Sequence, residues 1–340
     1  MRVLVCGGAG YVGSHMVRKL IQSGHIPVVF DNMSTGHSWA LREAFKGAEE
    51  QGVAPVLVQG DVLNIDELDA LFEKNPVEAV MHFSARSLVS ESVESPDLYY
   101  HGILVGSLNL LAAANRHKVD KFIFSSTAAV YGTPEVMPIR EDCPGKPISP
   151  YGQASRMVEM ILEDYALAYG LKSISLRYFN AAGADPAGGL GEDHNPETHL
   201  IPNVLKAILG QTPPLEIFGN DYSTPDGTGI RDYVHVMDVA QAHLLALNYL
   251  CEQKEPSFSV FNIGSGKGFS VREVMDAAER VTGQWVPYTF GNRRPGDPPV
   301  LVASAEKAKE VLGWAPEITC LDEIIRSVWN WFKNSEHKEN

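Results

Sequence analysis

A threonine and a tyrosine have the types and spacing of a proton-transfer pair. Thr127 ends the apolar run KFIFSST (121–127), which predicts a strand, and Tyr151 follows 24 residues later at the start of a helical stretch. A phenol has a pKa of about 10 and is a poor base until a neighbour, such as a cation, lowers that pKa. A hydroxyl and a phenol placed in this way suit proton transfer at an alcohol carbon. A packing role for Tyr151 on an amphipathic helix is the alternative that the spacing leaves open.

A glycine-rich loop near the N-terminus predicts a nucleotide phosphate site. The sequence GGAGYVG (7–13) follows one apolar run and opens a helical stretch. Gly7 permits the tight turn, Gly10 lets the backbone approach a pyrophosphate, and Gly13 allows the helix to pack closely on the strand. The helix N-terminus adds N–H groups and a partial positive charge. A glycine turn that only packs against the sheet is the alternative.

Two carboxylates follow the next apolar runs. Asp31 ends PVVFD (27–31), 18 residues after Gly13, and Asp61 ends PVLVQGD (55–61). An acid at the position of Asp31 can accept hydrogen bonds from ribose hydroxyls and would repel a 2′-phosphate, so NAD is preferred over NADP. Asp61 would lie near the adenine, although it could equally cap a helix.

Short apolar runs alternate with helical stretches in the first half of the chain, which predicts a parallel sheet covered by helices on both faces. Right-handed crossovers then give an α/β, doubly wound (Rossmann) fold. After Asn180 the chain is rich in Gly, Pro, Asp and Thr, so residues 181–340 are predicted to form a second, smaller domain over the carboxyl ends of the strands. Residues 1–180, with 233–268 returning to them, form the first domain. The predicted strands are 3–7, 27–31, 55–61, 79–85, 121–127, 173–180 and 260–266, and the predicted helices include 14–24, 106–117, 201–210, 271–283 and 321–333.

Composition and charge argue against several classes of protein. The chain has 340 residues, a formal net charge of -14 and a pI of about 5.2, so it lacks the basic footprint of a nucleic-acid-binding protein. It contains no run of about 18 apolar residues that would predict a membrane span. Its four cysteines are far apart and form no C-x-x-C pair, so neither a zinc site nor a disulfide is predicted. A cytoplasmic protein without a metal is the expectation.

Segments along nearly the whole chain resemble the extended short-chain dehydrogenase/reductase family, and within it they are most similar to the UDP-glucose 4-epimerases. The resemblance implies that residues 1–180 bind NAD and that residues 181–340 bind a UDP-sugar. The segments that carry it are GGAGYVGSH (7–15), DNMSTGH (31–37), GDV (60–62), HFSA (82–85), FSSTAAVYG (124–132), SPYG (149–152), LRYFNAAGA (176–184), GEDHNPETHLIPNV (191–204), FGNDYSTPDGTGIRDYVHVMDVA (218–240), FNIGSG (261–266) and RRPGD (293–297).

The resemblance implies an isomerase that inverts carbon 4 of UDP-galactose or UDP-glucose through a transient 4-keto sugar, with NAD reduced and reoxidised in each turnover. Tyr151 is the implied base for the sugar 4-hydroxyl, and Thr127 the hydroxyl that hydrogen-bonds the sugar oxygen. The implied cofactor-binding residues are Gly7, Gly10, Tyr11, Val12, Gly13, Asp31, Asn32, Ser34, Asp61, Val62, Phe83, Ser84, Ala85, Ser87, Ser125, Tyr151 and Tyr178.

A second set of residues is implied to hold the UDP-sugar. Two arginines suit a pyrophosphate, because guanidinium forks match phosphate oxygens, although each alone could be a surface ion pair. Leu301 is implied to border the 2-substituent of the sugar, and because leucine is smaller than an aromatic residue, N-acetylated sugars could also fit. A homodimer through the stretches 91–117 and 151–169 is implied as well, although their apolar faces could equally be core. The implied substrate-binding residues are Thr127, Tyr151, Asn180, His199, Leu200, Phe218, Arg231, Tyr233, Arg294, Asp297 and Leu301.

Two positions depart from the family pattern. The family has Tyr-x-x-x-Lys, whereas Ser155 stands at the lysine position of this chain. That lysine would bind the nicotinamide ribose and lower the pKa of the tyrosine. Ser155 therefore occupies a catalytic position but lacks the positive charge of the lysine. Arg156 is one residue further, about 100° around the helix, and is expected to point elsewhere. Asparagines of the family are replaced by Gly102 and Ile103, and an apolar Ile103 cannot make the hydrogen bonds of an amide.

These departures leave two rivals to an active epimerase. One is a catalytically impaired or non-catalytic homologue that still binds NAD and a UDP-sugar. The other is a nucleotide-sugar dehydratase or decarboxylase of the same extended family. Such enzymes require acidic or further basic groups beside the active-site hydroxyl. In this chain Ala128 and Ala129 follow Thr127, which disfavours that alternative.

Overall fold

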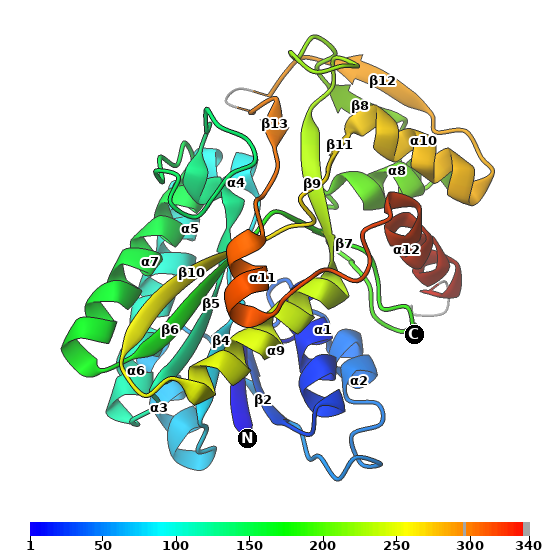
Figure 1. Ribbon diagram of the computed structural model, residues 1–340. Coiled ribbons are helices and arrows are strands. Elements are labelled where there is room, and N and C mark those ends of the chain that lie inside the picture. The colour runs from blue at the N-terminus through cyan, green and yellow to red at the C-terminus, as the bar shows by residue number, and fades with distance from the viewer. Residues whose placement is uncertain (295–296, 336–340) are drawn as a thin grey trace.

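A parallel sheet lies at the centre of the molecule, as drawn in the computed structural model of Figure 1, which describes residues 1–294 and 297–335. Within these residues, seven strands form that sheet in the order β10-β6-β5-β4-β1-β2-β3. Of these, β1, β2 and β4 are short apolar runs that are buried almost throughout, as expected for strands covered on both faces. The strands are β1 (Arg2–Cys6), β2 (Ile26–Asp31), β3 (Val56–Gln59), β4 (Ala79–His82), β5 (Lys121–Thr127), β6 (Lys172–Tyr178) and β10 (Ser257–Ile263).

Helices cover both faces of this sheet (Figure 1). On one face α3 (Ile65–Lys74), α6 (Gly106–Arg116) and α7 (Pro150–Tyr169) bury apolar side chains such as Leu68, Leu110 and Val158. On the other face Leu20, Leu247 and Trp314 belong to a second core cluster. The helices there are α1 (Tyr11–Gln22), α2 (Ser38–Ala44), α9 (Val236–Glu252) and α11 (Glu306–Leu312). The predicted α/β, doubly wound fold is therefore confirmed, and the predicted strands lie within a few residues of the observed ones.

The chain after Asn180 contains more strands than the sequence predicted. A small sheet is built from β7 (Asn180–Ala182), β9 (Ile230–His235), β11 (Gly268–Ser270) and β13 (Val300–Leu301), and a separate pair from β8 (Leu215–Phe218) and β12 (Tyr288–Gly291). These strands have two to six residues. Such lengths are too short to show a clear alternation of apolar and polar side chains among glycines and prolines.

Three amphipathic helices pack around these small sheets. They are α8 (Leu200–Ile208), α10 (Val271–Thr282) and α12 (Leu321–Ser335), and they bury Val204, Val274 and Ile325 in one core cluster. The helix α10 begins with a capping box, in which Ser270 and Glu273 satisfy each other's backbone N–H groups. The sequence predicted all three helices to within a few residues.

A buried ion pair attaches α7 to the central sheet. Glu159 of α7 is fully buried, and Arg177 of β6 donates to it from Nε to Oε1 at 2.8 Å and from Nη2 to Oε2 at 2.5 Å. The hydroxyl of Ser126, at the end of β5, donates to the same carboxylate at 2.7 Å. Arg177 also donates to the hydroxyl of Tyr131 at 2.8 Å, and Tyr131 donates to Asn262 of β10 at 2.6 Å. The Glu159 carboxylate therefore joins α7 to β5 and β6, and Arg177 and Tyr131 extend the network to β10.

We expect Arg177→Met to lower the free energy of unfolding by about 3 to 5 kcal/mol, because it leaves the Glu159 carboxylate buried without its main partner. Urea denaturation would measure the loss. The matched control is Arg156→Met, since Arg156 contacts the same carboxylate at 3.2 Å but its side chain is 34% exposed. An exposed partner of this kind contributes about 1 kcal/mol or less.

The double variant Glu159→Leu with Arg177→Met should be less destabilised than Arg177→Met alone, because no charge then remains buried. Equal and small losses for Arg177→Met and Arg156→Met would contradict the assignment of this ion pair as the attachment of α7.

Candidate active site

The start of α7 brings Tyr151 to Thr127. Ser149 caps the helix, its hydroxyl accepting from the N–H of Gly152 at 3.2 Å, and Pro150 occupies the first turn. Gly152 is required for the approach, because a Cβ there would meet the carbonyl oxygen of Ala129 at 2.4 Å. Ala129 in turn donates its N–H to the hydroxyl of Thr127 at 3.1 Å. The predicted pair is therefore adjacent, with a hydrogen bond between the two hydroxyls.

The surroundings of Tyr151 disfavour its charged form. Burial raises the pKa of Tyr151 above its usual value of 10.0, and the hydrogen bond with Thr127 lowers it only in part. Among the described side chains, no positive charge contributes to this pKa. The ring of Tyr99 meets that of Tyr151 edge to face at 6.1 Å and helps to hold it. The phenol is thus well positioned but not activated by the protein.

Neither Ser155 nor Arg156 replaces the missing lysine charge. Ser155 is buried, and its hydroxyl donates to the carbonyl of Tyr151, one helical turn earlier, at 3.0 Å. Arg156 is turned to Glu159, as expected from its place on the helix. Ile103 is also buried, in a π-helical turn (Tyr100–Val105) that packs into the core beneath α7. The two departures from the family pattern therefore leave neutral, apolar surroundings.

The glycine loop has the shape of a phosphate cradle. Gly7 has a φ of 78°, and a Cβ on it would meet the backbone N of Ser84 at 2.5 Å. A Cβ on Gly13 would meet the carbonyl oxygen of Gly7 at 2.1 Å, so the first turn of α1 packs directly on the loop. At Gly10 the nearest atom would be 3.5 Å away, which leaves room for a ligand to approach the backbone. The N–H groups of that first turn have no partners within the helix.

Acidic and amide groups gather at the carboxyl ends of β2 and β3. Asp31 accepts from the N–H of Ala9 in the glycine loop at 2.8 Å and from that of Met33 at 2.8 Å. The side-chain amide of Asn32 donates to Asp61 at 2.9 Å. Each Asp31 oxygen keeps a further lone pair, so these residues fit the adenosine half of a dinucleotide beside the glycine cradle.

The predicted substrate residues lie along the small sheet. Asn180 of β7 is paired with Tyr233 of β9, and Arg231 of β9 is paired with Leu301 of β13. Because Thr127 is paired with Tyr178 across β5 and β6, the chain leads from the Tyr151 pair directly to Asn180. The Tyr151–Thr127 pair is therefore joined to the predicted substrate residues of the small sheet by a short stretch of chain.

Two of the predicted substrate residues are arginines, Arg231 and Arg294. Arg231 forms an ion pair with Asp297, and the guanidinium of Arg294 lies 4.0 Å from the ring centre of Phe218. The hydroxyl of Tyr222 donates to Asp297 at 3.4 Å. Charged forks and an aromatic face in one place fit a nucleoside diphosphate. Pro295 and Gly296 of the RRPGD motif lie outside the described residues.

A buried carboxylate fixes β9 within this arrangement. Asp232 accepts backbone N–H groups from Ser265 at 2.7 Å, Gly266 at 3.0 Å and Ala303 at 3.1 Å. Burial raises the pKa of Asp232, and these hydrogen bonds oppose that rise. The residues on either side of it, Arg231 and Tyr233, are therefore held in register with β13 and β7.

Known proteins match this chain over nearly its full length. A family model described as GDP-mannose 4,6 dehydratase matches residues 4–328. A UDP-glucose 4-epimerase of Streptococcus mutans is 48% identical, over 97% of this chain and 96% of the relative. The chain belongs to the UDP-glucose 4-epimerase family.

Solved structures of this epimerase family superpose closely. The UDP-glucose 4-epimerase of Brucella ovis in complex with NAD has a TM-score of 0.91 and 45% identity, covering 97% of this chain and 98% of that one. The enzyme of Bifidobacterium longum in complex with NAD+ and UDP has a TM-score of 0.92 and 36% identity, covering 98% of each chain.

The other residues that the sequence predicted to bind NAD or the UDP-sugar lie in different surroundings. Val12 and Val62 pack into the two core clusters, the N–H of Ser34 donates to Asn32, and Ala85 and Ser87 are exposed after β4. Tyr11 lies in the first turn of α1, and its hydroxyl donates to the carbonyl of Gly183 at 2.6 Å. His199 and Leu200 lie at the start of α8, where His199 is hydrogen-bonded to Glu192.

One residue that the sequence did not single out joins several predicted ones. His243 of α9 lies 4.7 Å from Phe83 between ring centres and 3.3 Å from the hydroxyl of Ser125, and its ring also faces Tyr178 at 5.8 Å. Burial lowers the pKa of His243 to about 4, so it is neutral and supports these residues by packing. It stands inside an amphipathic helix far along the chain, where no local pattern distinguishes it.

Proposed function

We propose that the chain is an isomerase that interconverts UDP-galactose and UDP-glucose with NAD as cofactor, through a transient 4-keto sugar. The observation that carries this proposal is the adjacent pair of Tyr151 and Thr127 at the end of β5, in the same molecule as a glycine cradle and the Asp31 carboxylate. Bound NAD would supply the oxidising power, accepting the hydrogen of C4 with its electron pair and returning it.

The chain's own residues would move one proton. The Tyr151 phenolate accepts it from the sugar 4-hydroxyl and returns it when the new hydroxyl forms. Thr127 hydrogen-bonds the same sugar oxygen and favours the phenolate. Because the C4 hydrogen leaves one face and returns to the other, the sugar must turn between the two steps. A firm hold on the UDP with a loose hold on the hexose would allow that turn.

We assign the two ligands to two parts of the chain. Residues 1–180, with 233–268, would bind NAD, and residues 181–340 the UDP-sugar. The two arginines and Phe218 support a UDP site, since they combine charged forks with an aromatic face. The segment after Thr127 favours an epimerase over a dehydratase, because Ala128 and Ala129 offer no acid or base beside the reacting sugar.

Ser155 would lower the rate without abolishing it. A cation near an acidic group lowers its pKa by about one to three units, and each unit corresponds to about tenfold in available base at neutral pH. The enzyme would therefore lose roughly one to three orders of magnitude in activity for lack of the lysine, while the Thr127 hydrogen bond and the positive nicotinamide ring of NAD would still favour the phenolate.

We expect Ser155→Lys to raise kcat for UDP-galactose by about 10- to 1000-fold at neutral pH, because it restores a cation beside Tyr151. Proton NMR of UDP-glucose formation in the presence of NAD would measure the change. Ser155→Met is the matched control, since it adds a chain of similar length without charge, and should give no comparable gain.

The pH dependence supplies a second readout of the same change. Because the base is the deprotonated phenol, log kcat should rise with pH below the pKa of Tyr151, and Ser155→Lys should move that rise to lower pH. Equal gains from lysine and methionine would contradict an electrostatic role for position 155. No turnover in either the unmodified chain or Ser155→Lys would contradict the epimerase proposal and favour a protein that binds NAD and a UDP-sugar without catalysis.

We also propose that the N-acetylated sugars UDP-GlcNAc and UDP-GalNAc are substrates. Leu301 is half-buried in β13 and packs against the cluster of Val130, Tyr131 and Ile139, next to the end of β5. Leu301→Tyr should lower kcat/KM for UDP-GlcNAc relative to UDP-glucose at least about tenfold, because the larger ring excludes the acetyl group. Leu301→Val should leave the ratio unchanged. Turnover of the unacetylated sugars alone by the unmodified chain would contradict this assignment.

We propose that the protein is a homodimer. Exposed apolar side chains such as Val93 of α4 (Val89–Glu94), Leu108 of α6 and Leu167 of α7 support an interface on that face. Light scattering would then give about twice the 37.2 kDa of one chain.

We propose that the protein lies in the cytoplasm. Among the described helices, none is long and apolar enough to cross a membrane. Cell fractionation would test the compartment.

A further inference from the structure

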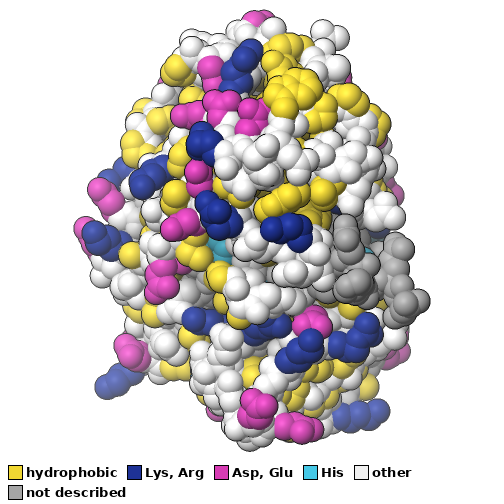
Figure 2. All heavy atoms as spheres, turned by 90° about the vertical axis from the view of Figure 1, so that its right-hand side faces the viewer, with side chains coloured by type: hydrophobic (Ala, Val, Ile, Leu, Met, Phe, Trp, Pro, Cys, Tyr) yellow, Lys and Arg dark blue, Asp and Glu magenta, His cyan; other side chains and the backbone are white. Residues whose placement is uncertain are grey.

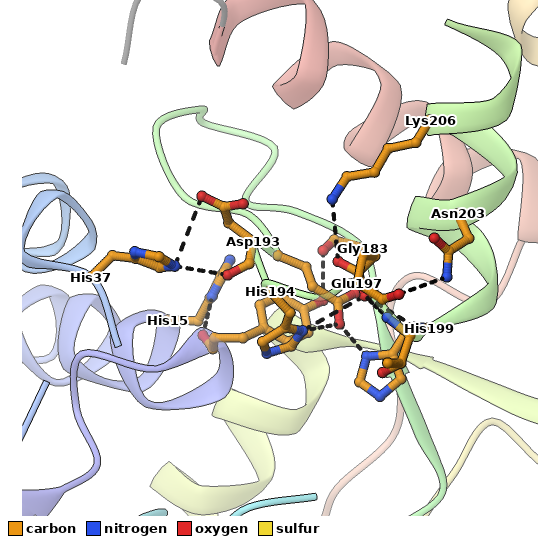
Figure 3. A network of polar contacts seen from close by, with 12 residues as sticks. His15, His37, Gly183, Asp193, His194, Glu197, His199, Asn203 and Lys206 are labelled. Carbon is orange, nitrogen blue, oxygen red and sulfur yellow. Dashed lines mark hydrogen bonds and ion pairs between the residues drawn. The ribbon is translucent and has the colours of Figure 1, made fainter. Parts of the chain in front are cut away.

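Four side chains with metal-binding atoms meet in the segment before α8. They are Glu192, His194, Glu197 and His199, and one ligand atom from each lies within 4.8 Å of all the others. Figure 3 shows His194, Glu197 and His199 directed toward one another, with Lys206 reaching toward Glu197 from α8. They follow the spacing Glu-x-His-x-x-Glu-x-His within eight residues. From the sequence no metal was expected, because the four cysteines form no C-x-x-C pair.

The carboxylate of Glu192 contacts both imidazoles. Its side chain is 2% exposed, and its Oε1 lies 3.1 Å from Nδ1 of His194 and forms a short hydrogen bond with Nδ1 of His199. Two imidazole nitrogens therefore point at one buried oxygen. A small cation placed between the two nitrogens and this oxygen would be within reach of all three.

Glu197 brings a second buried carboxylate to the same place. Its side chain is 3% exposed, and its Oε1 accepts the N–H groups of Thr198 at 2.8 Å and His199 at 3.0 Å. Its Oε2 is buried and, within the described part of the chain, has no hydrogen-bond partner. The Nζ of Lys206 lies 3.9 Å from this oxygen, which is too far for a hydrogen bond.

Two carboxylates this deeply buried require more positive charge than one lysine supplies. Burying an ionised carboxylate is costly unless it is paired and hydrogen-bonded. A doubly charged cation would balance both carboxylates and bind neutral imidazoles.

We propose that Glu192, His194, Glu197 and His199 form a binding site for a divalent transition-metal cation such as zinc. Two imidazole nitrogens and two carboxylate oxygens are a ligand set that zinc accepts in tetrahedral geometry, with bonds of about 2.0 to 2.2 Å. Donor atoms around such an ion lie about 3.3 Å apart, so the cluster needs only small side-chain movements to close. Four protein ligands leave no position open, which indicates a structural rather than a catalytic ion.

The ion would order the segment from Glu192 to His199, which lies beside the glycine cradle. The ring of His194 meets that of Tyr11, in the first turn of α1, edge to face at 6.3 Å. A narrow pocket there is lined from both sides, by Gly10 and Tyr11 on one and by Asp193 and His194 on the other. An ion bound by residues 192–199 would therefore hold this segment in place against the glycine cradle. This role is independent of the proton transfer proposed for Tyr151.

The test is zinc binding by the whole chain after removal of metals with a chelator. We expect one zinc per chain by elemental analysis, competition with a chromophoric chelator, and a higher melting temperature with zinc bound. Magnesium should not compete, because it prefers oxygen ligands. His194→Gln and Glu197→Gln should each weaken binding by about 100-fold or more, since loss of a supporting residue outside the ligand set already costs about 10- to 100-fold.

The matched control is His117→Gln. His117 also lies beside a carboxylate, with Nε2 at 3.4 Å from Asp69, but outside the cluster, so zinc affinity should be unchanged. Cobalt provides a readout on the unmodified chain: intense visible absorption of a tetrahedral ion is expected. No saturable zinc binding, a cobalt spectrum like that of the hydrated ion, or equal affinity of the His194→Gln and His117→Gln variants would overturn the site. None of these readouts depends on epimerase activity.

Discussion

The buried ion pair between Glu159 and Arg177 determines where Tyr151 lies. It attaches α7 to β6, and the Ser126 hydroxyl attaches the same carboxylate to β5, one residue before Thr127. A helix held at this point can bring its first turn against Ala129, because Gly152 has no side chain to prevent the approach. Removing either charge would leave the other buried without its main partner, so the stability of the fold and the geometry of the site depend on the same contact.

That ion pair also shapes the electrostatics of the site. Glu159 attracts Arg156, the cation next to position 155 on α7, and directs it away from the phenol. Ser155 is neutral, and its hydroxyl is occupied by the backbone of Tyr151. The site therefore combines a well-ordered phenol and threonine with surroundings that oppose ionisation. The position of the phenol is therefore set without the charge that would activate it, and among the described side chains the Thr127 hydroxyl is the group that favours the phenolate.

The sequence predicts the central sheet well because each of its strands is a compact apolar run between helical stretches. It also indicates the pair Thr127 and Tyr151 and the glycine cradle, since these depend on local motifs. The strands after Asn180 were missed because they are short, and β9 is held by a distant carboxylate network around Asp232. His243 and the cluster around Glu192 depend on tertiary contacts. The glutamates and histidines were visible in the sequence, but their convergence was not.

The most direct measurement is the pKa of Tyr151 itself, in the cofactor-free protein. Tyrosine labelled with carbon-13 at Cζ can be titrated by NMR, with Tyr151→Phe to identify the signal. We expect a pKa above 10, because burial outweighs the hydrogen bond from Thr127. A pKa below 10 would contradict this view of the site, since it would mean that another positive group activates the phenol in place of the lysine.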